Sequence, residues 1–133
     1  MELIVAFSTH DGENLVTDDH AGQARYFDLY RLSGNGAEFV ERRENSKYGG
    51  DEALRHGDPE KAKKSLNALD GVHAWANPRF GPNLPRLLKK LVCVVVRVEK
   101  VSDAVDLASQ HFDEVVKQHE AGEERSHVVL KPQ

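Results

Sequence analysis

The sequence predicts an α/β protein built on a mixed five-stranded sheet flanked by about three helices. Two observations carry this prediction. The first half of the chain contains three strand-like segments separated by turns and loops, and the second half alternates helical and strand periodicity. Strands joined by tight turns pair antiparallel, whereas a strand–helix–strand crossover places its strands parallel. The order β-β-β-α-β-α-β-α therefore predicts an antiparallel meander followed by parallel strands.

The three strands of the meander are bounded by polar or glycine-bearing segments. Leu3–Phe7 is a continuous apolar run, typical of a central strand, and it ends in the polar turn Ser8–Gly12. Ala24–Leu32 alternates between its two faces. The turn Ser33–Gly36 then joins it to Ala37–Arg42, which we expect to be its hairpin partner.

The middle of the chain begins with a polar, glycine-bearing segment, residues 44–57, which has neither periodicity and is expected to be a mobile loop. Asp58 is a helix-capping acid followed by proline, and an apolar stripe follows, so a helix is predicted over Pro59–Leu69. Val72–Ala76 is predicted to be a short strand.

The last third predicts two further helices around one buried strand. Leucines spaced three and four apart predict a helix over Leu84–Leu91, and Val92–Val98 reads as a buried strand. A final long helix is predicted from a cap at Ser102 to a stop at Gly122. His127–Leu130 is a candidate for a short edge strand.

Composition indicates one domain, over residues 1–120, with residues 121–133 as a tail. The chain has 133 residues, and an apolar content of 39% is enough for a single core. No apolar run approaches the roughly 20 residues that span a bilayer, and the first residues lack a secretory signal pattern, so we expect a cytoplasmic protein with no membrane partner. The formal charge of −4, with acids and bases interspersed, argues against nucleic acid as a partner.

A single cysteine limits the metal chemistry that the chain can support alone. Cys93 excludes an internal disulfide, a multi-cysteine zinc site and a self-sufficient iron–sulfur scaffold, which is normally held by about four thiolates. It lies within the predicted strand Val92–Val98, so we expect it to be a core residue.

Two stretches carry most of the functional information. His20 stands between acids and small residues directly before an alternating strand, so a ligand can reach its imidazole on a loop held by a rigid element. Asn77–Asn83 follows the fourth predicted strand. Ligands of open α/β sheets sit beyond the carboxyl ends of the parallel strands, where Ser8–Gly12 and Asn77–Asn83 should meet. A helix starting near Pro82 would also direct its free amides there.

The pattern of these stretches is shared with a known family. The shared features are the opening strand Leu3–Ala6 with Asp11 and Gly12, the stretch His20–Ala24 before Phe27–Tyr30, and Phe80–Asn83 after the fourth strand. Over residues 2–116 the chain resembles the nitrogenase iron-molybdenum cofactor biosynthesis and carrier domains. These are dinitrogenase iron-molybdenum cofactor-binding proteins of the NifX, NafY and NifB C-terminal type.

The resemblance implies a ribonuclease-H-like fold and a role in holding or delivering a preassembled metal–sulfur cluster, either the iron-molybdenum cofactor, its precursor or a related cluster. The cluster would be cargo, so it need not be present in the purified protein. The partners implied are cluster-donor and cluster-acceptor proteins, and we expect a monomer or weak dimer. The chain departs from the family at Ala21, where phenylalanine is usual, and at Arg79–Phe80, where smaller residues are common.

The resemblance assigns the role of cluster ligand to His20, and His56 and His10 are candidate second ligands. The residues expected to shape the pocket are Gly12, Gly22, Asn77, Arg79, Gly81 and Pro82. From the residues alone, a solvated or turn-capping histidine is the favoured interpretation of His20, and only the resemblance favours a ligand. His73, beside Trp75, is expected to be a hydrogen-bonded core or interface residue.

Two other functions remain as alternatives. An enzyme of the two-metal type needs converging carboxylates, but the predicted strands Leu3–Phe7 and Val72–Ala76 contain no acid, and Asp28 is expected to be isolated, so we predict that the protein is not an enzyme. A non-catalytic interaction or regulatory module would keep the fold and bind no cluster. Tyr26, Tyr30 and Trp75 would then form part of its partner surface.

Overall fold

The computed structural model describes residues 1–17, 23–45, 68–82 and 84–132, and every structural statement below concerns these ranges. Most of the predicted loop 44–57, and all but the last residues of the helix predicted over Pro59–Leu69, lie outside them. Leu69, at the end of that predicted helix, is described and is only 2% exposed.

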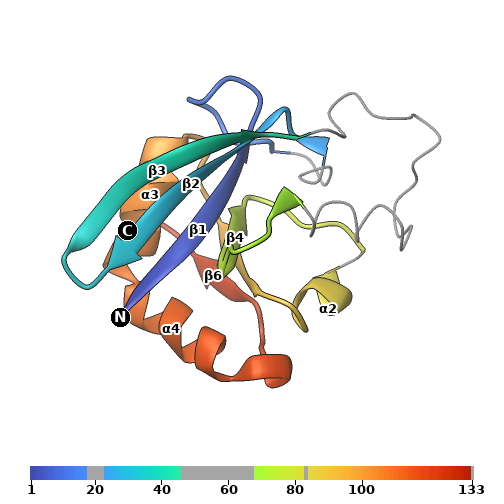
Figure 1. Ribbon diagram of the computed structural model, residues 1–133, viewed down its shortest axis with the longest axis vertical. Helices are drawn as coiled ribbons and strands as arrows, with labels where there is room; N and C mark the ends of the chain where they lie inside the picture. The colour runs from blue at the N-terminus through green and yellow to red at the C-terminus, as the bar shows by residue number, and fades with distance from the viewer. Residues whose placement is uncertain (18–22, 46–67, 83, 133) are drawn as a thin grey trace.

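The described strands form one mixed sheet in the order β3-β2-β1-β4-β5-β6 (Figure 1). Its members are β1 (Glu2–Thr9), β2 (Tyr26–Ser33), β3 (Gly36–Glu44), β4 (Ala74–Asn77), β5 (Val92–Val96) and β6 (Val128–Leu130). The first three strands pair antiparallel, whereas β4 pairs parallel to β1, β5 to β4, and β6 to β5. The predicted meander followed by parallel strands is therefore confirmed.

The described sheet has six strands rather than the predicted five because the tail contributes one. Val128 pairs with Val94 and Leu130 with Val96, which makes β6 an edge strand parallel to β5. Val128 and Leu130 are buried, while Val129, between them, is 41% exposed. The alternation follows from strand geometry, in which successive side chains point to opposite faces.

The β2–β3 hairpin corrects the expectation that Asp28 is isolated. Asp28 lies opposite Arg42 in the register of the two strands. Its carboxylate accepts two hydrogen bonds from the Arg42 guanidinium, at 2.7 and 3.1 Å, and its side chain is only 3% exposed. Sequence alone did not reveal this pair because the partners are joined only by strand register.

Three helices are described: α2 (Leu84–Leu87), α3 (Val101–Gln110) and α4 (Phe112–Glu120). The predicted helix over Leu84–Leu91 is thus a single turn of four residues followed by irregular turns. The predicted long helix is interrupted at His111, where the backbone leaves the helical region with φ −111° and ψ 30°.

Ser102 does not cap α3, as the sequence suggested. The N-cap is Lys100, and no side chain caps it. Instead, the Val101 N–H donates to the Glu13 carbonyl at 2.9 Å, and Leu15 N–H donates to the Glu99 carbonyl at 2.8 Å. Contacts with the loop after β1 therefore replace the local side-chain cap.

The sheet has an apolar cluster on each face. On one face, side chains of α3 and α4 pack on alternate residues of β1 and β5, including Val5, Phe7 and Val94. On the other face, Leu87 and the end of the predicted middle helix pack with Trp75 and Cys93. Cys93 is fully buried, as predicted, and burial raises the pKa of its thiol to about 12.

Candidate functional site

The loop after β1 is closed by its own hydrogen bonds. Thr9 Oγ1 accepts the Gly12 N–H at 2.9 Å and donates to the Asn14 carbonyl at 2.6 Å. Asp11 Oδ1 accepts the N–H groups of Asn14 and Glu13 at 2.8 and 2.9 Å. These bonds to Asn14 and Glu13 hold the pKa of Asp11 well below its usual range, since they favour the ionised carboxylate. The loop is thus a rigid element next to the carboxyl end of β1.

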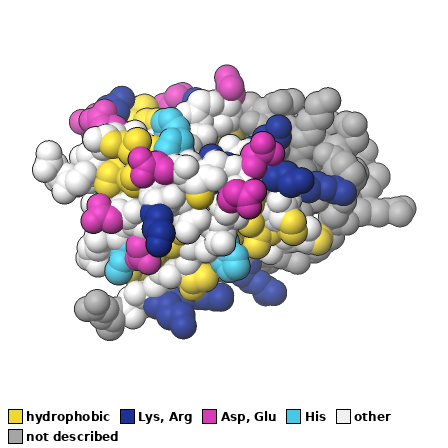
Figure 2. All heavy atoms as spheres, turned by 90° about the horizontal axis from the view of Figure 1, so that it is seen from below, with side chains coloured by type: hydrophobic (Ala, Val, Ile, Leu, Met, Phe, Trp, Pro, Cys, Tyr) yellow, Lys and Arg dark blue, Asp and Glu magenta, His cyan; other side chains and the backbone are white. Residues whose placement is uncertain are grey.

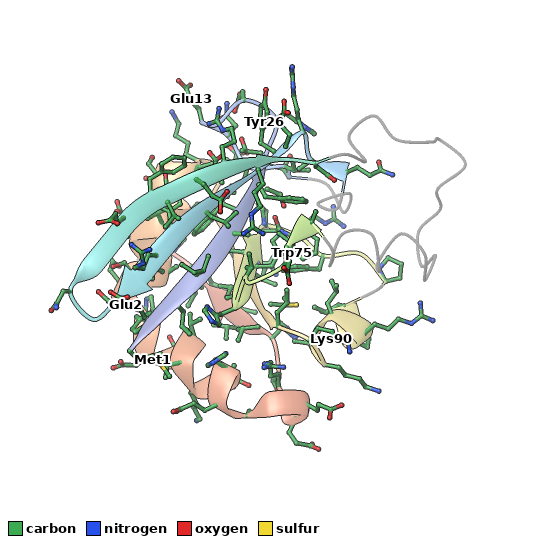
Figure 3. All side chains as sticks on the ribbon, viewed as in Figure 1. Met1, Glu2, Glu13, Tyr26, Trp75 and Lys90 are labelled. Atoms are coloured by element: carbon green, nitrogen blue, oxygen red, sulfur yellow. The ribbon has the colours of Figure 1, made fainter. Side chains whose placement is uncertain are left out.

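Gly12 lies where the side chain of Arg42, from β3, crosses the loop that follows β1. Its φ is +85°, and a Cβ there would collide with the Arg42 guanidinium. That guanidinium is held by Asp28 and lies over the Tyr26 ring, 4.8 Å from its centroid. In Figure 3, Tyr26 and Glu13 lie at the same end of the sheet. Gly12 therefore joins the loop to the hairpin.

The structure locates one of the three histidines that sequence analysis singled out as ligands. His10 is exposed, and its Nδ1 accepts the Arg25 N–H at 3.2 Å. This bond brings the chain that follows residue 22 against the loop after β1. His20, Gly22 and His56 lie outside the described residues.

The carboxyl ends of β1 and β4 are bound together by a buried polar network. The Asn77 amide, oriented to satisfy both its ends, donates to Ser8 Oγ at 2.8 Å and accepts from Trp75 Nε1 at 3.0 Å. The Trp75 Nε1–H also reaches Ser8 Oγ, at 2.7 Å. Ser8 and Asn77 are fully buried, so Asn77 braces the strand ends from within.

Trp75 is not available to a partner, contrary to the suggestion that it forms part of a surface. It is 3% exposed and lies among the strands in Figure 3. Its ring packs edge-to-face against Phe27 and Phe80, with centroid distances of 5.9 and 5.6 Å. Phe80 thereby anchors the loop that follows β4 to the core.

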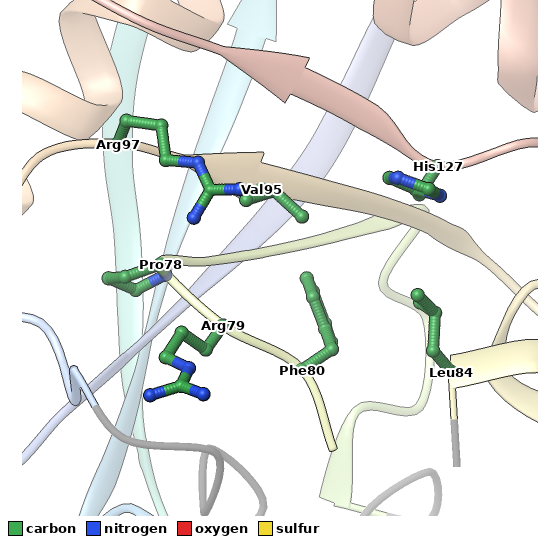
Figure 4. A pocket seen from close by; sticks show the side chains of 7 residues that line it. All are labelled: Pro78, Arg79, Phe80, Leu84, Val95, Arg97 and His127. Carbon is green, nitrogen blue, oxygen red and sulfur yellow. The ribbon is translucent and has the colours of Figure 1, made fainter. Parts of the chain in front are cut away.

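That loop opens onto a groove on the α2 face of the sheet. The groove has a volume of about 310 Å³. It is lined by Pro78, Arg79, Phe80, Leu84, Val95, Arg97 and His127, which Figure 4 shows from close by. Gly81 and Pro82 belong to the same loop, and the Gly81 carbonyl accepts the Leu84 N–H at 3.2 Å.

The groove is cationic in character. Its lining contains two guanidinium groups and an imidazole, with no acidic side chain. Within the described parts of the chain, neither Arg79 nor Arg97 pairs with a carboxylate. Arginine groups with open donors are suited to bind an anion, because guanidinium presents several N–H groups in a planar fork.

Arg97 and His127 were missed by sequence reasoning. Arg97 continues the alternation of Cys93 and Val95, so its face can be read from the sequence once β5 is identified. His127 gave no such signal because its position depends on how β6 pairs with β5. Arg97 and His127, which both line the groove, are thirty residues apart in the sequence.

Helix α2 is too short to supply the anion site that we expected at its start. It has four residues and begins at Leu84, next to Pro85. Among the described residues there is also no group of three or more histidine, cysteine or acidic side chains arranged to hold a metal ion. The charged and ionisable side chains that line the groove are therefore Arg79, Arg97 and His127.

The fold and the groove define an α/β domain with a groove lined by two arginines and no acidic side chain among the described residues. The chain belongs to the dinitrogenase iron-molybdenum cofactor family, whose sequence profile matches residues 1–119. A comparison with curated proteins finds no match. The match stops within α4, so the 3-10 turn Gly122–Glu124, His127 and β6 lie beyond it. None of the described helices is long and apolar enough to cross a membrane.

Proposed function

We propose that this protein binds the iron-molybdenum cofactor, its precursor or a related metal–sulfur cluster as cargo and delivers it to a partner protein. The observation that supports this function is a cationic groove, without acidic lining, in a chain that belongs to the iron-molybdenum cofactor family. The charge of a metal–sulfur cluster responds to its surroundings, and sulfide-rich clusters are commonly anionic. Arg79 and Arg97 would offset that charge.

His20 is the proposed metal ligand, a role that rests on the family resemblance. Neutral imidazole is a good ligand for iron and related transition metals. The hydrogen bond from the Arg25 N–H to His10 Nδ1 holds Arg25 against the loop that follows β1. Arg25 comes shortly after His20 in the sequence. A carrier must release its cargo, which favours a site with few protein ligands over a cage of four thiolates.

The proposal includes a non-catalytic role in the cytoplasm, with cluster-donor and cluster-acceptor proteins as partners and a monomer or weak dimer as the working form. A different role is an interaction module that binds no cluster. The exposed residues Phe39 and Val40 of edge strand β3 would suit such a module, since they are 49% and 36% exposed.

Anaerobic titration with isolated iron-molybdenum cofactor tests this function. The wild type and the His20→Ala variant are titrated, passed through gel filtration and analysed for molybdenum and iron. His111→Ala is the control, because His111 lies at the junction of α3 and α4, on the opposite face from the groove. We expect metal to co-elute with the wild type and the control.

The His20→Ala variant should retain at least about tenfold less metal, which is the usual scale for losing a side chain that holds a metal in place. Equal retention by wild type and His20→Ala would keep the carrier function and reject His20 as the ligand. Absence of metal from all three proteins would favour the interaction module.

A further inference from the structure

We propose that His127, which lies beyond the family match, is a second metal ligand for the cargo, acting from the far end of the groove. This inference rests on the proposed function and names which residues receive the cluster. The tail would then be part of the binding site and not only an edge of the sheet. Four features of the described structure support it.

The first feature is that the chain around His127 is anchored on both sides. Before it, the Ser126 N–H donates to Gln118 Oε1 at 2.9 Å, and Arg125 Nη1 donates to the Leu88 carbonyl at 3.1 Å. After it, Val128 is buried and paired with Val94. These contacts tie the segment to α4, to the turns after α2 and to β5. The backbone that carries the imidazole is therefore positioned before any ligand arrives, which lowers the entropic cost of binding.

The second feature is the side-chain environment of the imidazole. His127 is exposed and lines the groove, and the described structure records no hydrogen bond or ion pair for its ring. By contrast, the histidines between and within α3 and α4 are in contact with neighbouring side chains: His111 Nδ1 lies 2.9 Å from Glu114 Oε2, and the His119 ring packs edge-to-face against His73, with its Nδ1 buried away from solvent. The His127 ring nitrogens are thus open to a ligand.

The third feature is the distribution of charge along the groove. In Figure 4 the guanidinium groups of Arg79 and Arg97 lie toward the Pro78 end, and the His127 imidazole lies at the opposite end, beside Leu84. Phe80 and Val95 lie between the two ends. A ligand that reaches both ends of the groove would contact the two arginines at one end, Phe80 and Val95 in the middle and the imidazole nitrogens of His127 at the other end.

The fourth feature is size. The groove volume of about 310 Å³ is roughly ten times the share of one water molecule in the liquid, about 30 Å³. A single oxyanion would leave most of it filled by solvent. A compact anionic cluster of several metal and sulfur atoms fits better, since sulfide faces pack against apolar walls while arginines balance charge and imidazole coordinates a metal.

Three proteins test the inference: wild type, His127→Gln and, as the matched control, His111→Gln. Each is titrated anaerobically with isolated iron-molybdenum cofactor, and retained molybdenum is measured after gel filtration. We expect wild type and control to bind alike and the His127→Gln variant to bind at least about tenfold more weakly, since glutamine keeps a polar side chain but lacks the imidazole donor. Thermal unfolding of the variant should match the wild type, because His127 is exposed.

A second measurement does not depend on a change of affinity in a variant. In wild-type protein labelled with ¹⁵N at histidine side chains, loading with the cofactor should shift or broaden the ring resonances of His127 and leave those of His111 unchanged. Assignment uses the two variants without cargo.

The outcomes separate this inference from the function on which it rests. Binding by wild type that is unchanged in His127→Gln, with no change at the His127 resonances, would overturn the role of His127 and leave the carrier function intact. No binding by wild type would overturn both. Weaker binding by His127→Gln with an altered His127 signal supports both.

Discussion

Gly12 is a single residue on which the shape of the first loop depends. Its φ of +85° lies in the left-handed region, and the space that a Cβ would fill is occupied by the Arg42 guanidinium. Any side chain would strain the backbone and also displace an arginine that is hydrogen-bonded to the buried Asp28. Packing between the loop and β3 therefore favours glycine at position 12, in addition to the backbone conformation.

The Gly12→Ala substitution should lower the free energy of unfolding by about 1–3 kcal/mol, the usual scale for strain at a left-handed residue. Urea unfolding followed by the fluorescence of Trp75, the one tryptophan of the chain, measures this. Gly34→Ala is the matched control, because nothing lies within 4 Å of a Cβ at that turn glycine. Equal stability of the two variants would show that Arg42 moves aside without cost.

Asp28 and Arg42 show how far a residue's role depends on a distant partner. In the sequence Asp28 is a lone acid in an alternating strand, with no signal of its own. In the structure its bidentate bond to Arg42 places that arginine against both Gly12 and Tyr26. A buried carboxylate is stable only when its charge is balanced, so Asp28 and Arg42 act as one unit.

At the scale of elements, two histidines connect the start of β4 with α4. His73 Nδ1 accepts the Ile4 N–H of β1 at 2.8 Å, so the proton of its neutral ring is on Nε2. Its ring packs edge-to-face against His119 of α4, with centroids 5.3 Å apart. His73 is therefore a hydrogen-bonded interface residue, as the sequence suggested.

The pKa of His73 is lowered below its ordinary value, mainly by burial and to a smaller extent by the nearby His119. Protonation of Nδ1 would also remove the bond to Ile4. The unfolded chain binds a proton near pH 6.5, whereas the folded chain resists it, so the unfolded state holds more protons in that range. The contribution of His73 to stability is thus complete above about pH 6.5 and is lost as the pH falls through the lower folded pKa.

We therefore expect the free energy of unfolding to decrease between about pH 7.5 and 5.5, with part of the slope removed in His73→Gln. Urea titrations at several pH values measure both slopes. His111→Gln serves as the control, because it leaves the contacts of His73 with Ile4 and His119 in place. An identical slope in wild type and His73→Gln would assign the pH dependence to other groups.

At the scale of the whole molecule, net charge and local charge differ in sign. The chain carries a formal charge of −4, and Figure 2 shows acidic side chains interspersed with basic ones over the described part of one face. The groove nevertheless gathers Arg79 and Arg97 with no acid in its lining. A negative protein with a cationic groove would bind an anionic cargo locally while repelling anions elsewhere.

This contrast predicts a specific dependence on salt. The affinity of the wild type for iron-molybdenum cofactor should fall as KCl is raised from 0.05 to 0.5 M, because the Debye length shrinks from above about 10 Å to a few ångströms. Arg97→Gln should bind more weakly at low salt and lose less affinity over the same range. Lys131→Gln, an exposed cation of the tail outside the groove lining, is the control. Parallel salt curves for wild type and Arg97→Gln would remove Arg97 from the site.

The sequence by itself determined the order and type of the strands, the parallel crossovers and the buried position of Cys93. These follow from periodicity and turn residues, which are local properties of the chain. It also indicated the loop that contains Arg79. The break in the helix at His111 was not predictable in this way. Nor was the start of α3 at Val101, because hydrogen bonds of Val101 and Glu99 with Glu13 and Leu15, near the other end of the chain, set that start.

Only the tertiary structure decided which residues share the groove. Arg79 follows β4, Arg97 follows β5 and His127 precedes β6, and they line one groove because those three strands pair in parallel register. The same holds for Asp28 with Arg42 and for His73 with His119. The register of the parallel strands and the docking of α4 are set by long-range packing. Asp28 faces Arg42 because the register of the β2–β3 hairpin shifts between Leu29 and Tyr30, an irregularity that the turn residues do not reveal.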